Sequence, residues 1–271
     1  APRCYAYGDY YRKRGIMVFM GGVHPSMLPE EAAQHADVVF TGFSEQTFPR
    51  FIRDFAAGSW QRFYRQNEDF TIAGRPLPRR DLLQKKRYIT TSTVEAIRGC
   101  VHTCSFCAYP AAFGRTVYKR PVKEVVAEIE ALHTKHVVFP DVNLITDRKY
   151  AMELFSALIP LKIIWLGLVT SSLGIDEELL SVFRRSGCRG LLIGFESITQ
   201  ESQAYIHKGV NQVESYVELM KKLHDNGILV QGCFAFGGDE EDVSVFDRTV
   251  EMTVKAKIDL PRYSILTPFP G

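Results

Sequence analysis

Three cysteines lie close together in the sequence, Cys100, Cys104 and Cys107, and their spacing is Cys-x3-Cys-x2-Cys. Cysteine thiolates at such short spacings hold iron–sulfur clusters. Three protein ligands on a four-iron cluster leave one iron open, and a substrate or cofactor can ligate it, as at the vacant position of a catalytic metal site. The motif therefore predicts an iron–sulfur centre with an open position.

Two other uses of these thiols are weaker interpretations. A structural zinc site needs a fourth Cys or His ligand, and His102 is awkwardly placed to complete a tetrahedron because it lies only two residues from Cys100. A disulfide is disfavoured, since three clustered cysteines leave an odd thiol and nothing else in the chain is typical of a secreted protein. The other three cysteines, Cys4, Cys188 and Cys233, are isolated in the sequence and are expected to be small buried residues in a reducing compartment.

Strand-like and helix-like segments alternate around the cysteine loop and must position it. Continuous apolar runs predict the strands 93–97, 137–139, 163–169, 190–195, 228–236 and 263–266. Apolar residues at helical spacing predict five helices between these strands. The sequence thus predicts an α/β fold with a six-stranded parallel sheet, in which the cysteine loop begins where the first strand ends.

Capping residues define several of the predicted helix ends. Asp147 is placed to cap the helix that follows it, and Asn211 with Glu214 forms the pattern of a capping box. Gly187 and Gly227 are expected to end helices. Near the start of the chain, the spacing of Phe48, Phe51, Ile52 and Phe55 predicts one buried helix face.

The composition is that of an ordinary globular protein and excludes few functions. The chain has 271 residues, of which 46% are hydrophobic and 24% charged, with a formal net charge of +2. This charge is too small to indicate a nucleic-acid partner, and the basic run within residues 61–91 is interpreted as a solvated linker. The most apolar run, 158–169, is shorter than a membrane span, so no transmembrane segment is predicted.

The cysteine spacing, with Arg98-Gly99 before it and Phe106 before its last cysteine, resembles the signature of the radical S-adenosylmethionine (SAM) enzymes. The resemblance implies a six-stranded partial barrel over residues 92–271. It also implies a [4Fe–4S] cluster held by Cys100, Cys104 and Cys107, whose open iron binds SAM. In that family an electron from the cluster cleaves SAM to a 5′-deoxyadenosyl radical.

The same resemblance implies SAM-binding residues at the strand ends. Asp141 and Asn143 match a position near the methionine end of SAM, although the family's usual pair of acids is incomplete here. A helix cap or a turn is the alternative role of Asp141. Glu196 lies in a Gly-x-Glu-Ser pattern that in relatives is close to SAM. A carboxylate at the end of a buried strand needs a hydrogen-bonding partner, which SAM would provide. A structural salt bridge is the alternative. Gly237 belongs to a turn near the adenine. Phe106 is expected either to pack there or simply to exclude water from the cluster.

Residues 1–60 resemble the C-terminal part of the cobalamin-binding domain that precedes the catalytic domain in one radical SAM subfamily. The pattern includes Gly21-Gly22-Val23-His24-Pro25-Ser26 and the run 36–45. In that subfamily the Gly-Gly pair lies beside the nucleotide tail of cobalamin, which makes Gly21 and Gly22 the expected contacts. The alternative is that the two glycines only form a tight turn. The rest of that site is expected to precede Ala1, so cobalamin binding is left open.

The favoured interpretation is a radical SAM enzyme, most commonly a cobalamin-dependent methyltransferase acting on an unreactive carbon. Enzyme alternatives are a methylthiotransferase or a radical SAM rearrangement or cyclisation. Methylthiotransferases carry three more upstream cysteines, whereas only Cys4 lies upstream here. The non-enzyme alternative is an iron–sulfur or zinc-binding scaffold. The expected partners are a small-molecule or natural-product substrate and an electron donor such as flavodoxin or ferredoxin, in the cytoplasm.

Overall fold

The computed structural model describes residues 1–269 and divides into two compact units. The first unit contains Ala1–Arg75 and Cys107–Thr116 together with the last described residues, and the second contains Pro76–Phe106 and Val117–Thr267. The predicted linker began at residue 61, yet the strand β3 (Phe63–Arg65) pairs with a strand of the first unit. The start of that segment therefore belongs to a sheet.

The second unit is built on a five-stranded parallel sheet of strand order β10-β9-β8-β7-β6. Its strands are β6 (His136–Val138), β7 (Ile164–Val169), β8 (Cys188–Glu196), β9 (Leu229–Phe236) and β10 (Leu260–Ile265). The order of the strands follows the sequence, as expected for repeated crossover connections. This confirms the predicted α/β class and parallel sheet.

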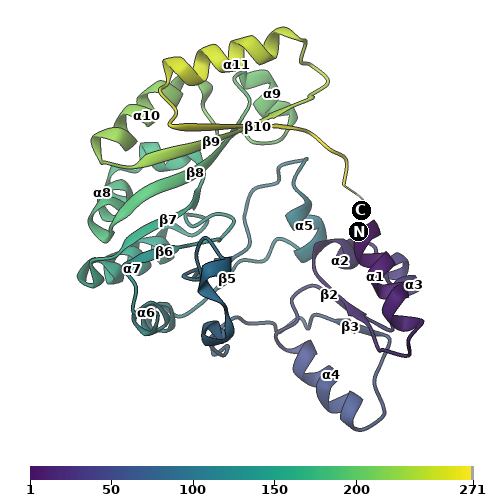
Figure 1. Ribbon diagram of the computed structural model, residues 1–271. Coiled ribbons are helices and arrows are strands. Elements are labelled where there is room, and N and C mark those ends of the chain that lie inside the picture. The colour runs from purple at the N-terminus through teal and green to yellow at the C-terminus, as the bar shows by residue number, and fades with distance from the viewer. Residues whose placement is uncertain (270–271) are drawn as a thin grey trace. The chain divides into compact units, whose positions relative to one another are not determined.

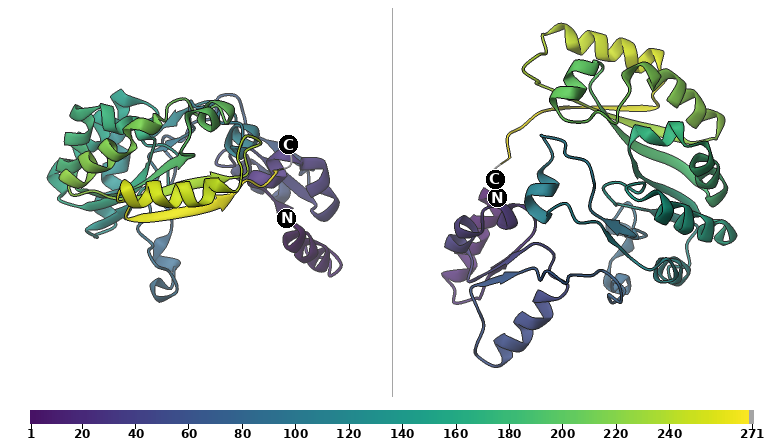
Figure 2. Two further views of the ribbon diagram at one scale, coloured as in Figure 1. Left: turned by 90° about the horizontal axis from the view of Figure 1, so that it is seen from above. Right: turned by 180° about the vertical axis from the view of Figure 1, so that it is seen from behind.

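Helices cover one face of this sheet (Figures 1 and 2). They are α6 (Val122–Ala131), α7 (Arg148–Leu158), α8 (Glu177–Ser186), α9 (Gln200–Tyr205), α10 (Tyr216–Asp225) and α11 (Ser244–Lys255). In β9 every second residue is buried against the helices, while the alternate residues are more accessible. Trp165, Phe155 and Phe183 form the centre of the core, with ring centroids 4.4–5.0 Å apart. These helices leave the other face of the sheet uncovered, and we call it the open face.

The predicted first strand, 93–97, does not extend the sheet as a full sixth strand. It makes one parallel bridge, between Thr93 and Val138, and then continues into the two-residue strand β4 (Ile97–Arg98). Strand β4 pairs antiparallel with β5 (Tyr118–Lys119), a strand that the sequence did not reveal. A full sixth strand is absent from this sheet because the backbone N–H groups of Ala96 and Ile97 donate to the side chain of Asp141 and not to a neighbouring strand.

Three of the predicted helix ends are confirmed, among them Gly227, which follows α10 in the left-handed conformation, and one is wrong. Asp147 caps α7 by accepting a hydrogen bond from the backbone N–H of Tyr150 at 2.9 Å, and Gly187 ends α8 in the left-handed conformation. Asn211 does not cap a helix, because α10 begins at Tyr216 and the side chain of Asn211 is buried among other groups.

Short 3-10 turns complete the second unit. They are η1 (Arg80–Leu82), η2 (Lys85–Arg87), η3 (Ile159–Leu161), η4 (Ser171–Ile175) and η5 (Val213–Ser215). Arg80 reaches from η1 to the buried carboxylate of Glu128 on α6, which also accepts from the buried Arg120. Part of the basic run predicted as solvated linker is thus attached to the second unit.

The first unit has a three-stranded parallel sheet of order β1-β2-β3, with β1 at Phe19–Met20 and β2 at Val38–Thr41. Its helices are α1 (Pro2–Arg12), α2 (Val23–Met27), α3 (Pro29–His35), α4 (Thr47–Ala56) and α5 (Ala108–Phe113). All four residues of β2 are buried because helices cover both faces of this strand. A parallel strand covered in this way is typical of an α/β unit.

The helix face predicted around Phe51 is only partly buried. Phe51 is 3% exposed and packs on Phe40 and Tyr64, whereas Ile52 and Phe55 are each about half exposed. The three-stranded sheet is too narrow to cover the whole apolar stripe of α4. None of the helices within residues 1–269 combines the length and apolar character needed to span a bilayer.

Candidate functional site

The cysteine loop joins β4 to α5, and two backbone hydrogen bonds attach it to the second unit. The N–H of Val101 donates to Oγ1 of Thr146, after β6, and the N–H of Ser105 donates to the carbonyl of Ile206, after α9, each at 3.1 Å. Gly99 turns the chain into the loop at φ +105°, a conformation that favours glycine. The loop therefore starts beside the carboxyl ends of the parallel strands.

The donor set of this loop fits an iron–sulfur cluster. Cys100, Cys104 and Cys107 form no disulfide, and thiols are the ligands that such clusters use. The Nδ2 group of Asn143 lies 3.9 Å from the Sγ atom of Cys100. Among residues 1–269, no three His, Cys, Asp or Glu side chains are gathered closely enough to hold a metal ion. The roles of the three cysteines as ligands stay a prediction from their type and spacing.

Asp141 is hydrogen-bonded to the backbone just before the cysteine loop. The side chain is 2% exposed, and its Oδ1 atom accepts hydrogen bonds from the backbone N–H groups of Ala96, at 2.8 Å, and of Ile97. The other oxygen, Oδ2, is buried without a hydrogen-bond partner among the described residues. Burial raises the pKa of Asp141 to about 7. These contacts give Asp141 a structural role, and its contact with SAM stays a prediction.

Glu196 ends β8 and forms a shielded ion pair with Lys208. Their side chains are 13% and 9% exposed, and Nζ of Lys208 lies 2.5 Å from Oε1 of Glu196. A Cβ atom at Gly194 would overlap both side chains, so the glycine leaves the space that the pair occupies. The sequence had offered a SAM contact or a salt bridge for Glu196. The structure contains the salt bridge, and the SAM contact stays a prediction.

The charges of this pair shift the pKa values of two further side chains. His102, in the cysteine loop, has its pKa lowered by burial and by the positive charge of Lys208. Cys233, opposite Gly194 on β9, has its pKa raised by burial and by the negative charge of Glu196. The ion pair thus lies near the cysteine loop and the end of β9. This is the strand-end position at which α/β folds bind their ligands.

A narrow cleft lies at the ends of β8, β9 and β10, and Phe106 is one of its walls. Ser197, Ile206 and Gly238 also line it. The backbone N–H groups of Gly237 and Gly238 both donate to Oε2 of Glu241, at 2.8 and 3.2 Å. The predicted glycine turn therefore points its N–H groups at a carboxylate from its own loop. Gly237 directly follows β9, and Phe106 lines the cleft from the cysteine loop. Their contacts with SAM stay predictions.

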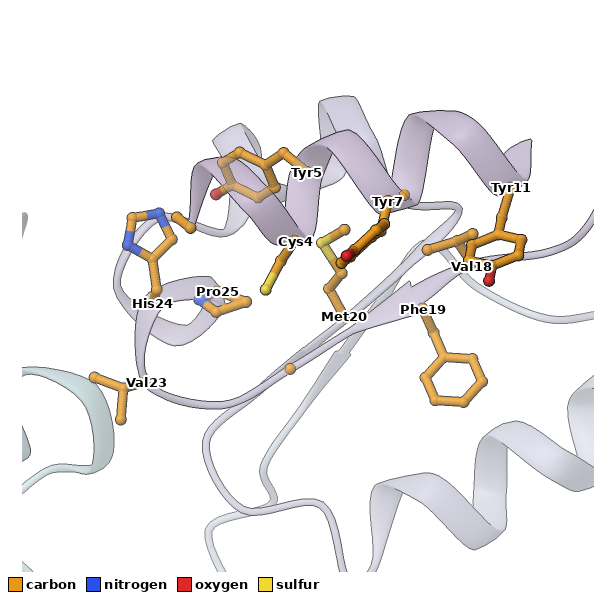
Figure 3. Close-up of a pocket in the computed structure, with 13 residues that line it drawn as sticks. Cys4, Tyr5, Tyr7, Tyr11, Val18, Phe19, Met20, Val23, His24 and Pro25 are labelled. Atoms are coloured by element: carbon orange, nitrogen blue, oxygen red, sulfur yellow. The ribbon is translucent and has the colours of Figure 1, made fainter. Parts of the chain in front are cut away.

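Gly21 lines a separate cavity within the first unit, of about 530 Å³. The cavity lies between α1 and β1, and the side chains of Cys4, Tyr7 and Met20 point into it (Figure 3). A Cβ atom at Gly21 would lie 3.3 Å from Cβ of Phe40. Gly22 has φ +98°, which favours glycine, and open space beside it. An apolar hollow bordered by bare backbone fits a ligand with an apolar part, and the cobalamin contacts stay predictions.

Sequence reasoning missed Lys208, which is the ion-pair partner of Glu196. A single lysine between two helices follows no periodic pattern, and twelve positions separate it from its partner. It also assigned Asn211 to a helix cap, although this residue is fully buried and hydrogen-bonded to the end of β8. The available signal was a cluster of polar residues, 196–212, directly after a strongly apolar strand.

A comparison with known protein families identifies the family of this chain. A model of the radical SAM superfamily matches residues 94–252, which is more than half of the chain. The chain belongs to the radical SAM superfamily. The match confirms the family inferred from the cysteine spacing. Radical SAM enzymes use a [4Fe–4S] cluster and SAM as cofactors.

Two curated radical SAM relatives match along the entire chain. Bacteriochlorophyllide d C-12(1)-methyltransferase of Chlorobaculum tepidum is 30% identical over 287 residues, covering 100% of this chain and 62% of the relative. Bacteriochlorophyllide d C-8(2)-methyltransferase of the same organism is 28% identical over 290 residues, covering 100% of this chain and 64% of the relative. The chain therefore spans less than two thirds of the length of these relatives.

A solved radical SAM structure has the same fold. The methyltransferase TsrM from Kitasatospora setae, with cobalamin and a [4Fe–4S] cluster bound, aligns with a TM-score of 0.75 at 17% identity. The alignment covers 96% of this chain and 59% of TsrM. The arrangement of elements, including a partial barrel, is thus one that a radical SAM protein adopts.

Proposed function

We propose that the intact protein is a cobalamin-dependent radical SAM methyltransferase that acts on an unreactive carbon. The observation that carries this proposal is the 30% identity to a methyltransferase over the whole chain, the first unit included. A likeness limited to residues 94–252 would support only the radical SAM part. The Gly21–Gly22 turn and the cavity beside it support a role of the first unit in cobalamin binding.

The residues divide between three cofactors in this proposal. The thiolates of Cys100, Cys104 and Cys107 hold the cluster. Glu196 and Lys208 offer SAM one negative and one positive group, both largely shielded from water. When bound, the cluster and SAM supply a radical that abstracts hydrogen, and cobalamin supplies a methyl carrier. The chain's own work is to bind these groups, orient them and exclude water.

The open face of the second unit's sheet supports a substrate with a large apolar part. Ile164 and Leu166 on β7, Leu229 on β9 and Leu260 on β10 are between 40% and 61% exposed. They occupy the amino-terminal part of the face, and the Glu196–Lys208 pair occupies its carboxyl end. Both relatives act on bacteriochlorophyllide d, as their names state. We therefore include a tetrapyrrole among the first substrates to be tested.

A low-potential electron donor completes the proposed system. Flavodoxin or ferredoxin is the proposed reductant, because reductive cleavage of SAM consumes one electron from the cluster. A cytoplasmic location is proposed because the six cysteines form no disulfide and a reducing compartment keeps thiols free. Neither proposal affects the assignment of residues.

Product analysis tests the proposed reaction. The intact protein, reconstituted with iron and sulfide without oxygen, is incubated with SAM, a reductant, cobalamin and the candidate tetrapyrrole. We expect 5′-deoxyadenosine and S-adenosylhomocysteine in a ratio of about one to one with methylated product, because each of two steps consumes one SAM. Omission of cobalamin serves as the control and should stop methylation.

Other outcomes identify the alternatives. Formation of 5′-deoxyadenosine and product without S-adenosylhomocysteine would replace methyl transfer by a rearrangement or cyclisation. Transfer of sulfur with the methyl group would indicate a methylthiotransferase. Isolation of a zinc protein without iron would overturn the enzyme proposal and leave a binding scaffold.

A further inference from the structure

The end of β8 departs from regular strand geometry at the residue before Glu196. The pairing with β9 shifts between Gly194, opposite Cys233, and Glu196, opposite Phe234, so that Phe195 is an extra residue. Glu196 itself has φ +63°, which is unusual for a residue with a side chain. Bulges of this kind often lie beside active sites, where they redirect a side chain. A strained residue persists only when its surroundings hold it in place.

Three buried polar side chains hold this bulge by bonding its carbonyl groups. Nδ2 of Asn211 donates to the carbonyls of Gly194 and Phe195, at 3.0 and 2.8 Å. Nε2 of Gln203 donates to the carbonyls of Phe195 and Ser197, at 2.5 and 2.8 Å. The hydroxyl of Tyr216 lies 3.1 Å from the carbonyl of Phe195 and 3.1 Å from Nε2 of Gln203. The bulge thus has side-chain donors where the regular strand ladder is interrupted.

The polar atoms of these three side chains are themselves satisfied. Asn211, Gln203 and Tyr216 are each 0% exposed. Oδ1 of Asn211 accepts from the hydroxyl of Ser171 at 2.7 Å, and Nδ2 of Asn211 lies 3.3 Å from Oε1 of Gln203. A fully connected buried network specifies one arrangement, because any unpaired member would incur the desolvation penalty.

The same segment carries the counter-ion of Glu196. Lys208 lies between Gln203 and Asn211 in the sequence, and its backbone is bonded to both. Its N–H donates to the carbonyl of Gln203 at 2.8 Å, and its carbonyl accepts from the N–H of Asn211 at 3.0 Å. The groups that fix the bulge therefore also fix the lysine that faces it.

We infer that Gln203, Asn211 and Tyr216 are positioning residues that hold the Glu196–Lys208 pair in the orientation that binds SAM. This inference rests on the proposed role of Glu196 in SAM binding. The three residues touch neither the cysteine loop nor the open face of the sheet through any contact described above. They act through the carbonyl groups of residues 194–197.

The first experiment measures SAM affinity and stability together in the intact, cluster-loaded protein. Asn211→Ala is expected to weaken SAM binding about tenfold, the effect of losing one buried hydrogen-bonding group. The matched control is Ser186→Ala, which removes the buried hydroxyl that accepts from Nε1 of Trp165 at 3.0 Å, in another part of the core. The control is expected to lower the unfolding temperature and leave SAM affinity unchanged.

A double substitution distinguishes positioning from simple loss of stability. If Asn211 acts through Glu196, the pair Glu196→Ala and Asn211→Ala weakens SAM binding by about as much as Glu196→Ala alone. Additive losses would overturn the inference. If Glu196→Ala alone leaves SAM affinity unchanged, the proposed role of Glu196 fails instead, so that the two failures are distinguishable.

Hydrogen exchange provides a readout that needs no SAM. Asn211→Ala should increase deuterium uptake in a peptide containing residues 194–198, while Ser186→Ala should not. Should Asn211→Ala fail to fold, Tyr216→Phe removes a single hydroxyl from the same network and is expected to shift both readouts in the same direction. Unchanged uptake and unchanged SAM affinity in Tyr216→Phe and Gln203→Ala would overturn the inference.

Discussion

At the scale of single residues, the cysteines of this chain have different environments and different expected roles. Cys100 and Cys104 are partly exposed and Cys107 is exposed, all on one loop, whereas Cys188 is fully buried in β8. Burial raises the pKa of the Cys188 thiol, which keeps it protonated and inert. Exposure alone does not mark the predicted cluster ligands, because Cys4, which was expected to be buried, is also exposed. The short spacing of Cys100, Cys104 and Cys107 in the sequence is what sets them apart.

Replacing Cys100, Cys104 or Cys107 singly by Ala should remove most of the bound iron and abolish SAM cleavage, because an iron–sulfur cluster with three protein ligands cannot spare one. Iron content and visible absorption after anaerobic reconstitution provide the measurement. Cys188→Ala is the control, expected to retain iron and to lower the free energy of unfolding by about 1 kcal/mol through a small cavity. Full iron loading in the Cys104→Ala protein would contradict this assignment.

Asp141 gives a second residue-scale prediction, which concerns pH. Its pKa is raised from 3.8 to about 7 in the folded protein, so that between about pH 4 and pH 7 the folded state keeps a proton that the unfolded state has lost. Stability from this group therefore falls as the pH rises through that range, and the loss is complete above pH 7. Asp141→Asn keeps the accepting oxygen but removes the titration.

Denaturant unfolding of the wild type and Asp141→Asn at several pH values tests this sign. The variant should gain stability relative to the wild type between pH 5 and pH 7, with little further change above pH 7. If the difference in the free energy of unfolding between the two proteins stays constant over this pH range, Asp141 does not titrate there.

At the scale of elements, two of the crossover helices, α8 and α10, are followed by glycines that have different surroundings. Gly187 ends α8 at φ +97°, and a Cβ atom there would overlap the carbonyl oxygen of Ile163 just before β7. Gly227 follows α10 at φ +70°, and a Cβ atom there would meet nothing within 4 Å. The first glycine is required by both conformation and packing, the second by conformation alone.

Gly227→Ala should lower the free energy of unfolding by about 1 kcal/mol, the usual penalty for a side chain in the left-handed region. Gly187→Ala should lower it clearly more, because the helix and β7 must also move apart. Chemical denaturation of both variants measures the difference. Equal losses would mean that the α8–β7 contact relaxes without strain.

At the scale of the whole molecule, each unit has its own core and its own candidate site. The cavity between α1 and β1 belongs to the first unit, and the Glu196–Lys208 pair belongs to the second. Cobalamin binding and SAM cleavage should therefore respond to different substitutions. Gly21→Trp would not test cobalamin binding by itself, because even a Cβ atom at this position would lie 3.3 Å from Cβ of Phe40 and a larger side chain would disturb the packing of the unit.

Cys4→Trp is the better test, because Cys4 is exposed on α1 and points into the cavity (Figure 3). In the intact protein it should weaken cobalamin binding by about tenfold or more by filling the cavity, while 5′-deoxyadenosine formation continues. Tyr10→Trp, on the same helix but outside the cavity lining, is the control. Normal cobalamin binding by Cys4→Trp would remove this cavity from the proposed site.

The sequence by itself indicated the family and the parallel α/β sheet, and it predicts the chemistry of the cysteine loop. The spacing of Cys100, Cys104 and Cys107 is a local property of the chain, and apolar runs such as 163–169 and 190–195 are long enough to specify buried parallel strands. Local end signals such as Asp147 and Gly187 were also reliable, since each acts on backbone within one helical turn.

Only the tertiary structure decided which polar groups meet. Asp141 replaces a strand neighbour for residues 96–97, and Asn211 bonds to the end of β8 in place of a helix terminus. Lys208 pairs with Glu196 across a loop and a short helix. A backbone carbonyl accepts equally well from any nearby donor, so local sequence cannot choose between partners whose proximity depends on the packing of the whole unit.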